Sequence, residues 1–359
     1  MEYIDEYRKK ELIFGISKTL KKISEKQISL MEVCGGHTMA IHRFGLHILL
    51  PSSIHLLSGP GCPVCVSSQH FIDTAIAYSN IPEAIITTYG DLIRVPGSVT
   101  TLEKEKANGN DIRIIYSVLE ALEISKINPE RPVIFLGIGF ETTSPATAAA
   151  IIQAKEQHIH NFFVLSSHKV MPPVMKALVV EGVKINGFIA PGHVSAITGV
   201  GIYHDLALKF GLGVVVSGFE PVDVMQSILM LTQQIESGSP KVEIQYKRIV
   251  HPEGNIIAKE MMERVFELKN ESWRGLGIIP ESGLKIRDGF SSFDAEKQFT
   301  VKIQQPVEPK GCICGLILRG LKNPNDCTLF TNKCTPNEPV GACMVSSEGT
   351  CATYYKYRS

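Results

Sequence analysis

The segment VIFLGIGFETTSPATAAAIIQAKEQ, residues 133–157, decides the fold class. It opens with an apolar run at 133–138, passes through a Gly- and Thr-rich loop, and ends in an alanine-rich helical stretch at 146–157. Strands that are buried on both faces of a parallel sheet are apolar in this continuous way, and a helix then returns the chain to the sheet. The segment therefore predicts one strand-and-helix unit of a parallel α/β sheet.

The same alternation continues on both sides of this segment. Strands are predicted at 29–33, 54–57, 84–88, 112–115, 133–138, 162–165, 187–190 and 214–216. Helices are predicted at 5–26, 67–78, 146–157, 174–180 and 222–237. This pattern predicts an α/β protein with two similar parallel-sheet domains that face a central cleft.

Changes in composition suggest where the domains divide. Polar stretches at 102–111 and 124–132 interrupt the pattern, and after residue 240 the text becomes Gly- and Pro-rich around a single helix near 255–268. The predicted units are an N-terminal helical arm (1–28), two α/β domains (29–125 and 126–238) and a C-terminal iron–sulfur domain (239–359).

Charge and composition narrow the function classes. Lys+Arg and Asp+Glu are 36 each in 359 residues, so no global field attracts nucleic acid or an anionic membrane. We find no secretory signal and no apolar run of about 18 residues that would span a membrane. A cytoplasmic location is expected, where nine cysteines are more typical of metal ligands or redox thiols than of structural disulfides.

Polar and sulfur-bearing residues recur immediately after the predicted strands. Ligands of open parallel sheets bind beyond the carboxyl ends of the strands, where helix N-termini supply amide donors. The residues that are expected to line one cleft are Cys34, His37, Cys62, Cys65, Asp91, Glu141, His168, His193 and Glu220.

The CPVC motif places Cys62 and Cys65 at the predicted entrance to a helix. This spacing permits a reversible disulfide, and a helix N-terminus stabilises a thiolate. The preceding Gly-Pro-Gly predicts a tight loop that presents the sulfur atoms rather than burying them. The alternative is a pair of incidental buried cysteines.

Cys34 precedes two glycines and His37, so that a thiol and an imidazole could point to one ligand. One cysteine and one histidine cannot complete a tetrahedral metal site. An iron at Cys34 would therefore need ligands from a partner protein or from exogenous groups. A buried cysteine in a Gly-rich turn, with His37 in a hydrogen bond, is the structural alternative.

Three further positions are weaker candidates. Glu141 could tune a neighbouring acid or a metal, whereas the hydroxyl residues at 142–144 are expected to cap the helix that opens at Pro145. His193 fits either a site role or a local hydrogen bond. Gly137-Ile138-Gly139 lacks the third glycine of a dinucleotide loop, so nucleotide binding is not expected.

Six cysteines crowd the C-terminal text, in GCICG (311–315), DCTLFTNKC (326–334) and GACMVSSEGTC (341–351). A four-iron cluster needs four thiolates, usually from loops. Zinc is the alternative, although neither CxxC knuckles nor paired histidines occur here.

Together these motifs resemble the HypD family of hydrogenase maturation factors. The resemblance rests on MEVCGGHT, LLSGPGCPVC, GFETTSPATA, PGHVSAITG and the tail CGLILRG, CTLF, CTP and GACMVSSEGTCATYYKY, and it extends from about residue 30 to the C-terminus. It implies a cytoplasmic scaffold, rather than a conventional turnover enzyme, for the Fe(CN)2CO unit of [NiFe] hydrogenases. The implied partners are the chaperone HypC, the cyanide donor HypE with HypF upstream, and indirectly the hydrogenase large subunit.

The resemblance also implies roles for individual residues. Cys34 becomes the iron-holding thiolate, with His37 beside it, and Cys62 with Cys65 becomes a redox pair. Glu141 and His193 fall in motifs of the family. The residues that the resemblance assigns to a [4Fe-4S] cluster are Cys312, Cys327, Cys334 and Cys351. Cys314 competes with Cys312 for that role, and Cys343 remains as a structural thiol.

Two other function classes remain open from the sequence. One is a general thiol–disulfide oxidoreductase in which the CPVC pair turns over on many proteins and the cluster is structural. The other is an electron-transfer or zinc-binding interaction protein that assembles no metal centre.

Overall fold

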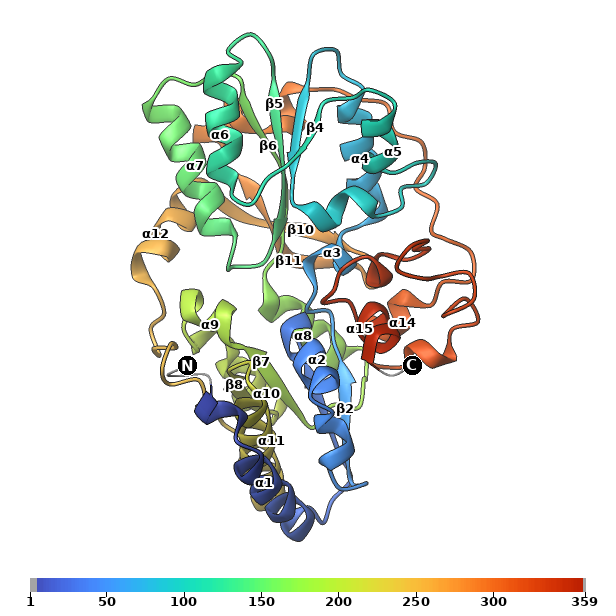
Figure 1. The fold of residues 1–359 in the computed structure, drawn as a ribbon. Coiled ribbons are helices and arrows are strands. Elements are labelled where there is room, and N and C mark those ends of the chain that lie inside the picture. The colour runs from blue at the N-terminus through green and yellow to red at the C-terminus, as the bar shows by residue number, and fades with distance from the viewer. Residues whose placement is uncertain (1–4, 358–359) are drawn as a thin grey trace.

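The chain folds around two parallel sheets, as the sequence predicts (Figure 1). The computed structural model describes residues 5–357. The first sheet has the order β2-β1-β7-β8-β9, with bounds Ile54–Ser58, Ile28–Glu32, Gly187–Pro191, Gly213–Ser217 and Val242–Ile244. The second has the order β4-β3-β5-β6, with bounds Ile112–Ile114, Ile85–Thr88, Val133–Gly139 and Phe162–His168.

All eight predicted strands are present, because each is an apolar run long enough to cross a sheet. Every residue of β5 is buried, as expected for a central strand covered on both faces. The sequence analysis missed β9, which pairs with β8 but is only half-buried, and so lacks the continuous apolar signal.

The two sheets divide the chain differently from the predicted boundaries. The first sheet takes β1 and β2 from the start of the chain and β7 to β9 from residues 187–244, whereas the second sheet is formed entirely by residues 85–168. The second unit is thus inserted into the first. The predicted boundary between residues 125 and 126 falls inside α6 (Val118–Ile127), whose flanking strands β4 and β5 belong to the same sheet.

Helices cover both sheets. Those before residue 130 are α1 Lys10–Ile23, α2 Gly35–Arg43, α3 Pro63–Val66, α4 Gln69–Ser79, α5 Leu102–Ala107 and α6. Those that follow are α7 Ser144–Glu156, α8 Met171–Val180, α9 Gly192–Thr198, α10 His204–Phe210, α11 Pro221–Ser237 and α12 Ile256–Val265. The N-terminal arm is confirmed as a helix, since α1 packs on α11; residues 1–4 of the arm lie outside the described part of the chain.

One local expectation about α7 is wrong. Pro145 does open the helix, but the hydroxyl residues before it do not cap it. Thr143 and Ser144 instead donate hydrogen bonds back to the carbonyl of Phe140. Their hydroxyls therefore stabilise the β5–α7 loop through hydrogen bonds within the loop.

The C-terminal part consists of an antiparallel hairpin and a loop-rich tail. The hairpin strands are β10 Phe266–Trp273 and β11 Gly277–Ile286. Trp273 is buried, its indole donates to the Ser282 hydroxyl, and the N–H of Arg274 donates to the carbonyl of Val66. The tail carries the short helices α13 Ala295–Gln298 and α14 Cys314–Leu318, then α15 Thr350–Tyr357, which packs on α2. The tail is thereby joined to the first sheet.

Strand register places the candidate loops side by side. β1 lies beside β7, which lies beside β8, and all three run parallel. The residues that follow them, Cys34, His193 and Phe219, therefore emerge at one edge of the first sheet. No helix within residues 5–357 combines the length and the hydropathy needed to cross a membrane.

Candidate metal-assembly site

Cys34 is held at the carboxyl end of β1, where it occupies the N-cap position of α2. Two close backbone contacts fix it. A Cβ on Gly61 would lie 2.3 Å from the Cys34 nitrogen, and a Cβ on Gly35 would lie 2.5 Å from the Glu348 carbonyl oxygen. Only glycine fits at both places. The GPGCPVC loop and the tail thus both pack tightly against the backbone around Cys34.

The Cys34 side chain is half-buried and lines a cavity of about 820 Å³. This volume lies within the range of about 300–1,000 Å³ that is typical of ligand sites. Aromatic and charged residues form the rest of the wall: Arg8, Arg43, His193, Phe219, Glu220, Tyr246, Arg248 and Glu348. The cavity therefore offers one thiol in a setting of mixed charge.

The cavity wall disfavours the ionised form of Cys34. Burial, with the negative charges of Glu348 and Glu32 adding to it, raises the pKa of the Cys34 thiol to about 12. Glu32 is itself buried, which raises its pKa to about 8, and it accepts a hydrogen bond from the Thr38 hydroxyl at 2.5 Å. Cys34 is accordingly a neutral thiol near pH 7.

The two histidines of the motifs contact the same aromatic ring. The rings of His37 and His193 each stack on the ring of Phe219, at centroid distances of 4.6 and 4.1 Å. His37 is buried, its Nε2 contacts the Gly218 carbonyl oxygen at 3.0 Å, and burial lowers its pKa to about 4. His193 is exposed and lines the cavity. Of the two, only His193 can reach a ligand in the cavity.

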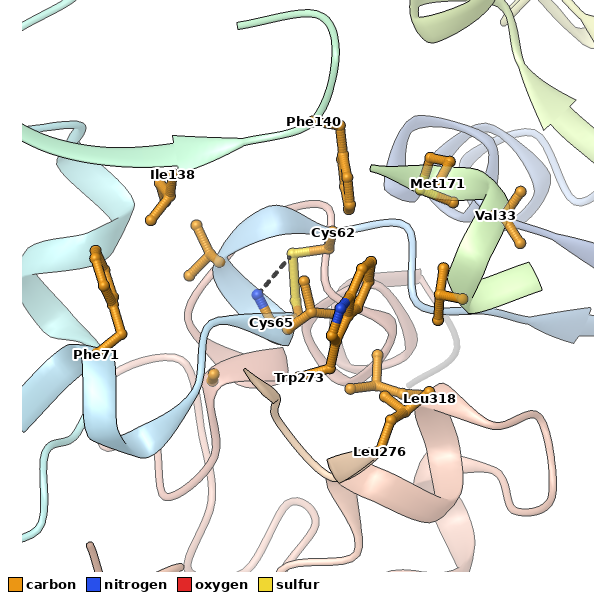
Figure 2. Close-up of a cluster of buried hydrophobic side chains, with 14 of the residues drawn as sticks. Val33, Cys62, Cys65, Phe71, Ile138, Phe140, Met171, Trp273, Leu276 and Leu318 are labelled. Atoms are coloured by element: carbon orange, nitrogen blue, oxygen red, sulfur yellow. Dashed lines mark hydrogen bonds between the residues drawn. A yellow bond between two sulfur atoms is a disulfide. The ribbon is translucent and has the colours of Figure 1, made fainter. Parts of the chain in front are cut away.

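Cys62 and Cys65 are joined by a disulfide at the start of α3. The expectation that the loop presents these sulfur atoms is wrong, because Cys62 is 4% exposed and Cys65 is fully buried. Figure 2 shows the pair beside Trp273 and below Phe140, within the core that fills the space between the sheets. Gly61 brings the loop against Cys34, but the short helix then turns the two sulfur atoms inward.

All six cysteines of the tail line one small apolar pocket. They come from separate loops and helix ends, and Cys314 and Cys343 also belong to the core that contains Cys62 and Cys65. The pocket volume is about 10 Å³, little more than one water-sized sphere. Within residues 5–357 no group of three or more His, Cys, Asp or Glu side chains is arranged to hold a single metal ion.

Comparison with known proteins assigns the chain to a family. The sequence profile of the hydrogenase formation hypA family, HypD, matches residues 8–358. The hydrogenase maturation factor HypD of Escherichia coli is 42% identical over 367 residues, which cover 100% of this chain and 98% of that protein.

The chain belongs to the HypD family of hydrogenase maturation factors.

Other HypD relatives agree with this assignment along the whole chain. HypD of Azotobacter vinelandii is 43% identical over 367 residues, covering 99% of this chain and 97% of that protein. HypD of Cupriavidus necator is 45% identical over 368 residues, with the same coverage. The resemblance that the sequence motifs indicated is therefore confirmed.

The structure does not gather all of the predicted HypD site residues. Cys34, His193 and Glu220 line the large cavity, and Asp91 lines a separate one of about 360 Å³ beside β3 and β5. Glu348 lines both cavities. His168 is buried between the hydroxyls of Thr147 and Ser166, so it makes local hydrogen bonds.

Glu141 lies at another cavity, of about 600 Å³, together with residues of α8, α12 and the hairpin. Cys34 does not line this cavity, and Glu141 does not line the cavity of Cys34. The structure therefore places these two predicted site residues at different cavities.

Sequence reasoning missed several residues of the Cys34 cavity. Phe219 precedes the predicted Glu220, and the stacking of its ring with two histidines has no signal in a single sequence. Arg248 is held by two hydrogen bonds to buried Asp223 and stacks on Tyr7 and Tyr246. The position of Arg248 at this cavity depends on the chain returning to the first sheet after the inserted second unit. The predicted strand pattern did not indicate that return.

The contact at Gly61 leads to a stability prediction. Gly61→Ala should lower the free energy of unfolding by about 1–3 kcal/mol, because the new methyl group would overlap the Cys34 backbone. Gly201→Ala is the matched control, since nothing lies within 4 Å of its Cβ position, and it should change stability by less than about 0.5 kcal/mol. Urea unfolding of both variants measures the difference, and equal midpoints would contradict the tight contact.

The raised pKa of Cys34 leads to a prediction about its reactivity. Iodoacetamide reacts with the thiolate, so labelling of Cys34 should accelerate about tenfold per pH unit from pH 7 to 9 without a plateau. A cysteine with an ordinary pKa of about 8.5 would accelerate only about threefold from pH 8 to 9, because most of its thiol is then ionised. Mass spectrometry of the Cys34 peptide, with Cys34→Ser as the blank, gives the rates; an increase of only about threefold between pH 8 and 9 would show that the thiol is not perturbed.

Proposed function

We propose that this chain is the scaffold on which the Fe(CN)2CO unit of a [NiFe] hydrogenase is assembled, with the iron held between Cys34 and a cysteine of HypC. The observation that carries the proposal is that, among residues 5–357, Cys34 is the one thiol that lines the large cavity. His37 is buried and does not line this cavity, and its Nε2 is engaged with the Gly218 carbonyl. The remaining ligands must come from a partner and from small molecules.

The positive charge of the iron explains how a thiol with a raised pKa can act as an iron ligand. An Fe²⁺ ion binds the thiolate, so binding displaces the thiol proton into solvent or onto a neighbouring base. Until then the neutral thiol resists alkylation and oxidation, because the thiolate is the reactive form. Cys34 would thus be protected when no iron is present and ionised when iron arrives.

Cys62 and Cys65 would form the redox pair of the site. Reduction of their disulfide takes two electrons and two protons and yields two thiols. Burial keeps this pair from exchanging with thiols in bulk water, whereas the Gly61 contact couples the loop to Cys34. Reduction or oxidation of the Cys62–Cys65 pair would therefore change the surroundings of the iron-binding thiol.

The tail fits a [4Fe-4S] cluster by its donor chemistry. Six thiols from different loops converge on one apolar pocket, whereas a cluster of this type needs four. The small volume means that the thiols would move apart to surround it. The proposed ligands remain Cys312, Cys327, Cys334 and Cys351, and Cys343 is buried towards the core. When bound, the cluster would supply one-electron redox chemistry.

The partners follow from this role. HypC would bring the second cysteine, HypE would bring cyanide that HypF prepares, and the hydrogenase large subunit would receive the finished unit. These proteins would meet this chain in the cytoplasm. Its action would be that of a scaffold that is reset after each transfer.

Anaerobic copurification with HypC tests the proposal. The complex should contain iron beyond that of the tail cluster and show infrared bands of cyanide and carbon monoxide. A complex that forms but shows neither band in the presence of HypE and HypF would refute the assembly role.

The competing function is general thiol–disulfide exchange. The burial of Cys62 and Cys65 counts against it, because an attacking thiolate must reach a disulfide sulfur. Vigorous turnover in insulin reduction with a matched reductant would favour this function over the scaffold.

A further inference from the structure

Glu141 lines a second cavity, and one of its two carboxylate oxygens is buried without a hydrogen-bond partner among the described residues. The side chain is 3% exposed, and its Oε1 accepts a hydrogen bond from the Met171 N–H at 3.0 Å. Its Oε2 is buried and has no hydrogen-bond partner among the described residues. An unsatisfied buried oxygen is costly, so such an atom beside a cavity indicates a donor that arrives from outside.

The cavity has the size and lining of a ligand site. Its volume is about 600 Å³, and apolar side chains of α8, α12 and the hairpin form much of the wall. Among them are Pro172, Met262, Phe266 and Leu268. A ligand that fits must therefore present a sizeable apolar body together with one polar group.

The charged residues at the rim of the cavity determine which charge the polar group of the ligand should carry. Glu263, Glu267 and Glu281 line the cavity against two cations, Lys259 and Arg287. Arg287 is paired with Glu267, whereas Glu263 and Glu281 make no ion pair with any residue in the range 5–357. Lys259 does not neutralise Glu141, because its Nζ donates to the Glu253 carbonyl at 2.7 Å. The cavity thus favours a cation.

Hydrogen-bond geometry narrows the cation further. A guanidinium group binds a carboxylate best through both oxygens, but Oε1 of Glu141 is occupied by the Met171 N–H. One free oxygen suits the compact point charge of an ammonium group. Burial raises the pKa of Glu141 to about 7, so an arriving ammonium would also fix the carboxylate in its charged form.

We propose that the Glu141 cavity binds a primary ammonium group on an apolar stem, with the ammonium on Oε2 of Glu141 and the stem against Phe266, Leu268 and Met262. Two sources share this chemistry: a free alkylamine and a lysine side chain of a partner protein. The site is separate from the Cys34 cavity and does not depend on the role proposed for that cysteine.

Calorimetric titration with matched probes tests the proposal. Hexylammonium should bind at least about tenfold more tightly than hexanol, which has the same stem and no charge, and hexanoate should not bind detectably. Equal affinities of hexylammonium and hexanol would overturn the proposal. A capped Ala-Lys-Ala peptide that binds more tightly than hexylammonium assigns the site to a partner's lysine, and the reverse order assigns it to a free amine.

Three variants separate the ammonium contact from folding. Glu141→Gln keeps an oxygen for the Met171 N–H and should reduce the preference for hexylammonium over hexanol to less than about twofold. Glu130→Gln, at an exposed carboxylate that does not line this cavity, should leave that preference unchanged. Leu268→Ala should weaken both probes by the same factor. A Glu141→Gln protein that is folded by circular dichroism and still prefers hexylammonium by tenfold would refute the role of Glu141.

Discussion

Cys34→Ser should abolish the cyanide and carbon monoxide infrared bands of the complex with HypC while leaving the fold intact. Serine has nearly the same volume, and Cys34 is half-buried, so the free energy of unfolding should change by less than about 1 kcal/mol. A hydroxyl group is a far weaker ligand than a thiolate for iron of this kind. We expect the iron beyond the tail cluster to fall by more than about tenfold.

Met39→Leu is the matched control for this experiment. Met39 lines the same cavity and carries sulfur, but a thioether does not ionise. The variant should keep the infrared bands and the second iron. Full-strength bands from the Cys34→Ser complex would exclude Cys34 as the iron-holding residue, and bands lost from both variants would indicate that the shape of the cavity, rather than the thiol, is required.

Cys327→Ala should remove most of the cluster absorbance of anaerobically purified protein, whereas Cys343→Ala should keep it. Cys327 is half-buried, so its loss costs little packing, but it deprives one iron of its thiolate. Cys343 is fully buried beside Cys314, and its loss should cost about 1 kcal/mol of stability without removing a ligand. Visible absorption and iron analysis of both proteins measure the effect.

The tail experiment also distinguishes cluster from zinc. Wild-type protein should contain about four iron atoms in the tail, as a [4Fe-4S] cluster requires. A colourless protein with zinc would refute the cluster, and a Cys327→Ala protein with full absorbance would remove Cys327 from the set of ligands. Retention by Cys327→Ala together with loss by Cys343→Ala would exchange the roles of these two cysteines.

The strands could be predicted from sequence because their signal is local. Continuous apolar runs such as 133–138 and 214–216, set between Gly- and Pro-containing loops, are typical of strands in a sheet covered on both faces. The assignment of strands to sheets could not be predicted, because it depends on which edges pair. β1 joins β7 across more than 150 residues, and no feature of either strand specifies that partner.

The candidate site was predicted in part for the same reason. Loops after parallel strands must meet at one edge, which placed Cys34 and His193 together correctly. The prediction failed where the direction of a side chain decides whether it reaches the cavity. Gly-Pro-Gly brings the CPVC loop to Cys34, but both sulfur atoms lie in the core beside Trp273. Glu141 follows β5 at the corresponding edge of the other sheet, yet its carboxyl group lies at another cavity.

The close contact between Glu348 and Gly35 determines when the Cys34 cavity can form during protein synthesis. The N-terminal part of a chain leaves the ribosome first, so β1, Cys34 and α2 are present well before residues 341–351. Glu348 supplies part of the cavity wall and its carbonyl rests against Gly35, so the Cys34 cavity is complete only once the last cysteines have been made and the tail has folded. A growing or tailless chain would therefore offer a bare thiol without its enclosure. The order of translation would therefore delay the enclosed Cys34 cavity until the cysteine-rich tail is in place.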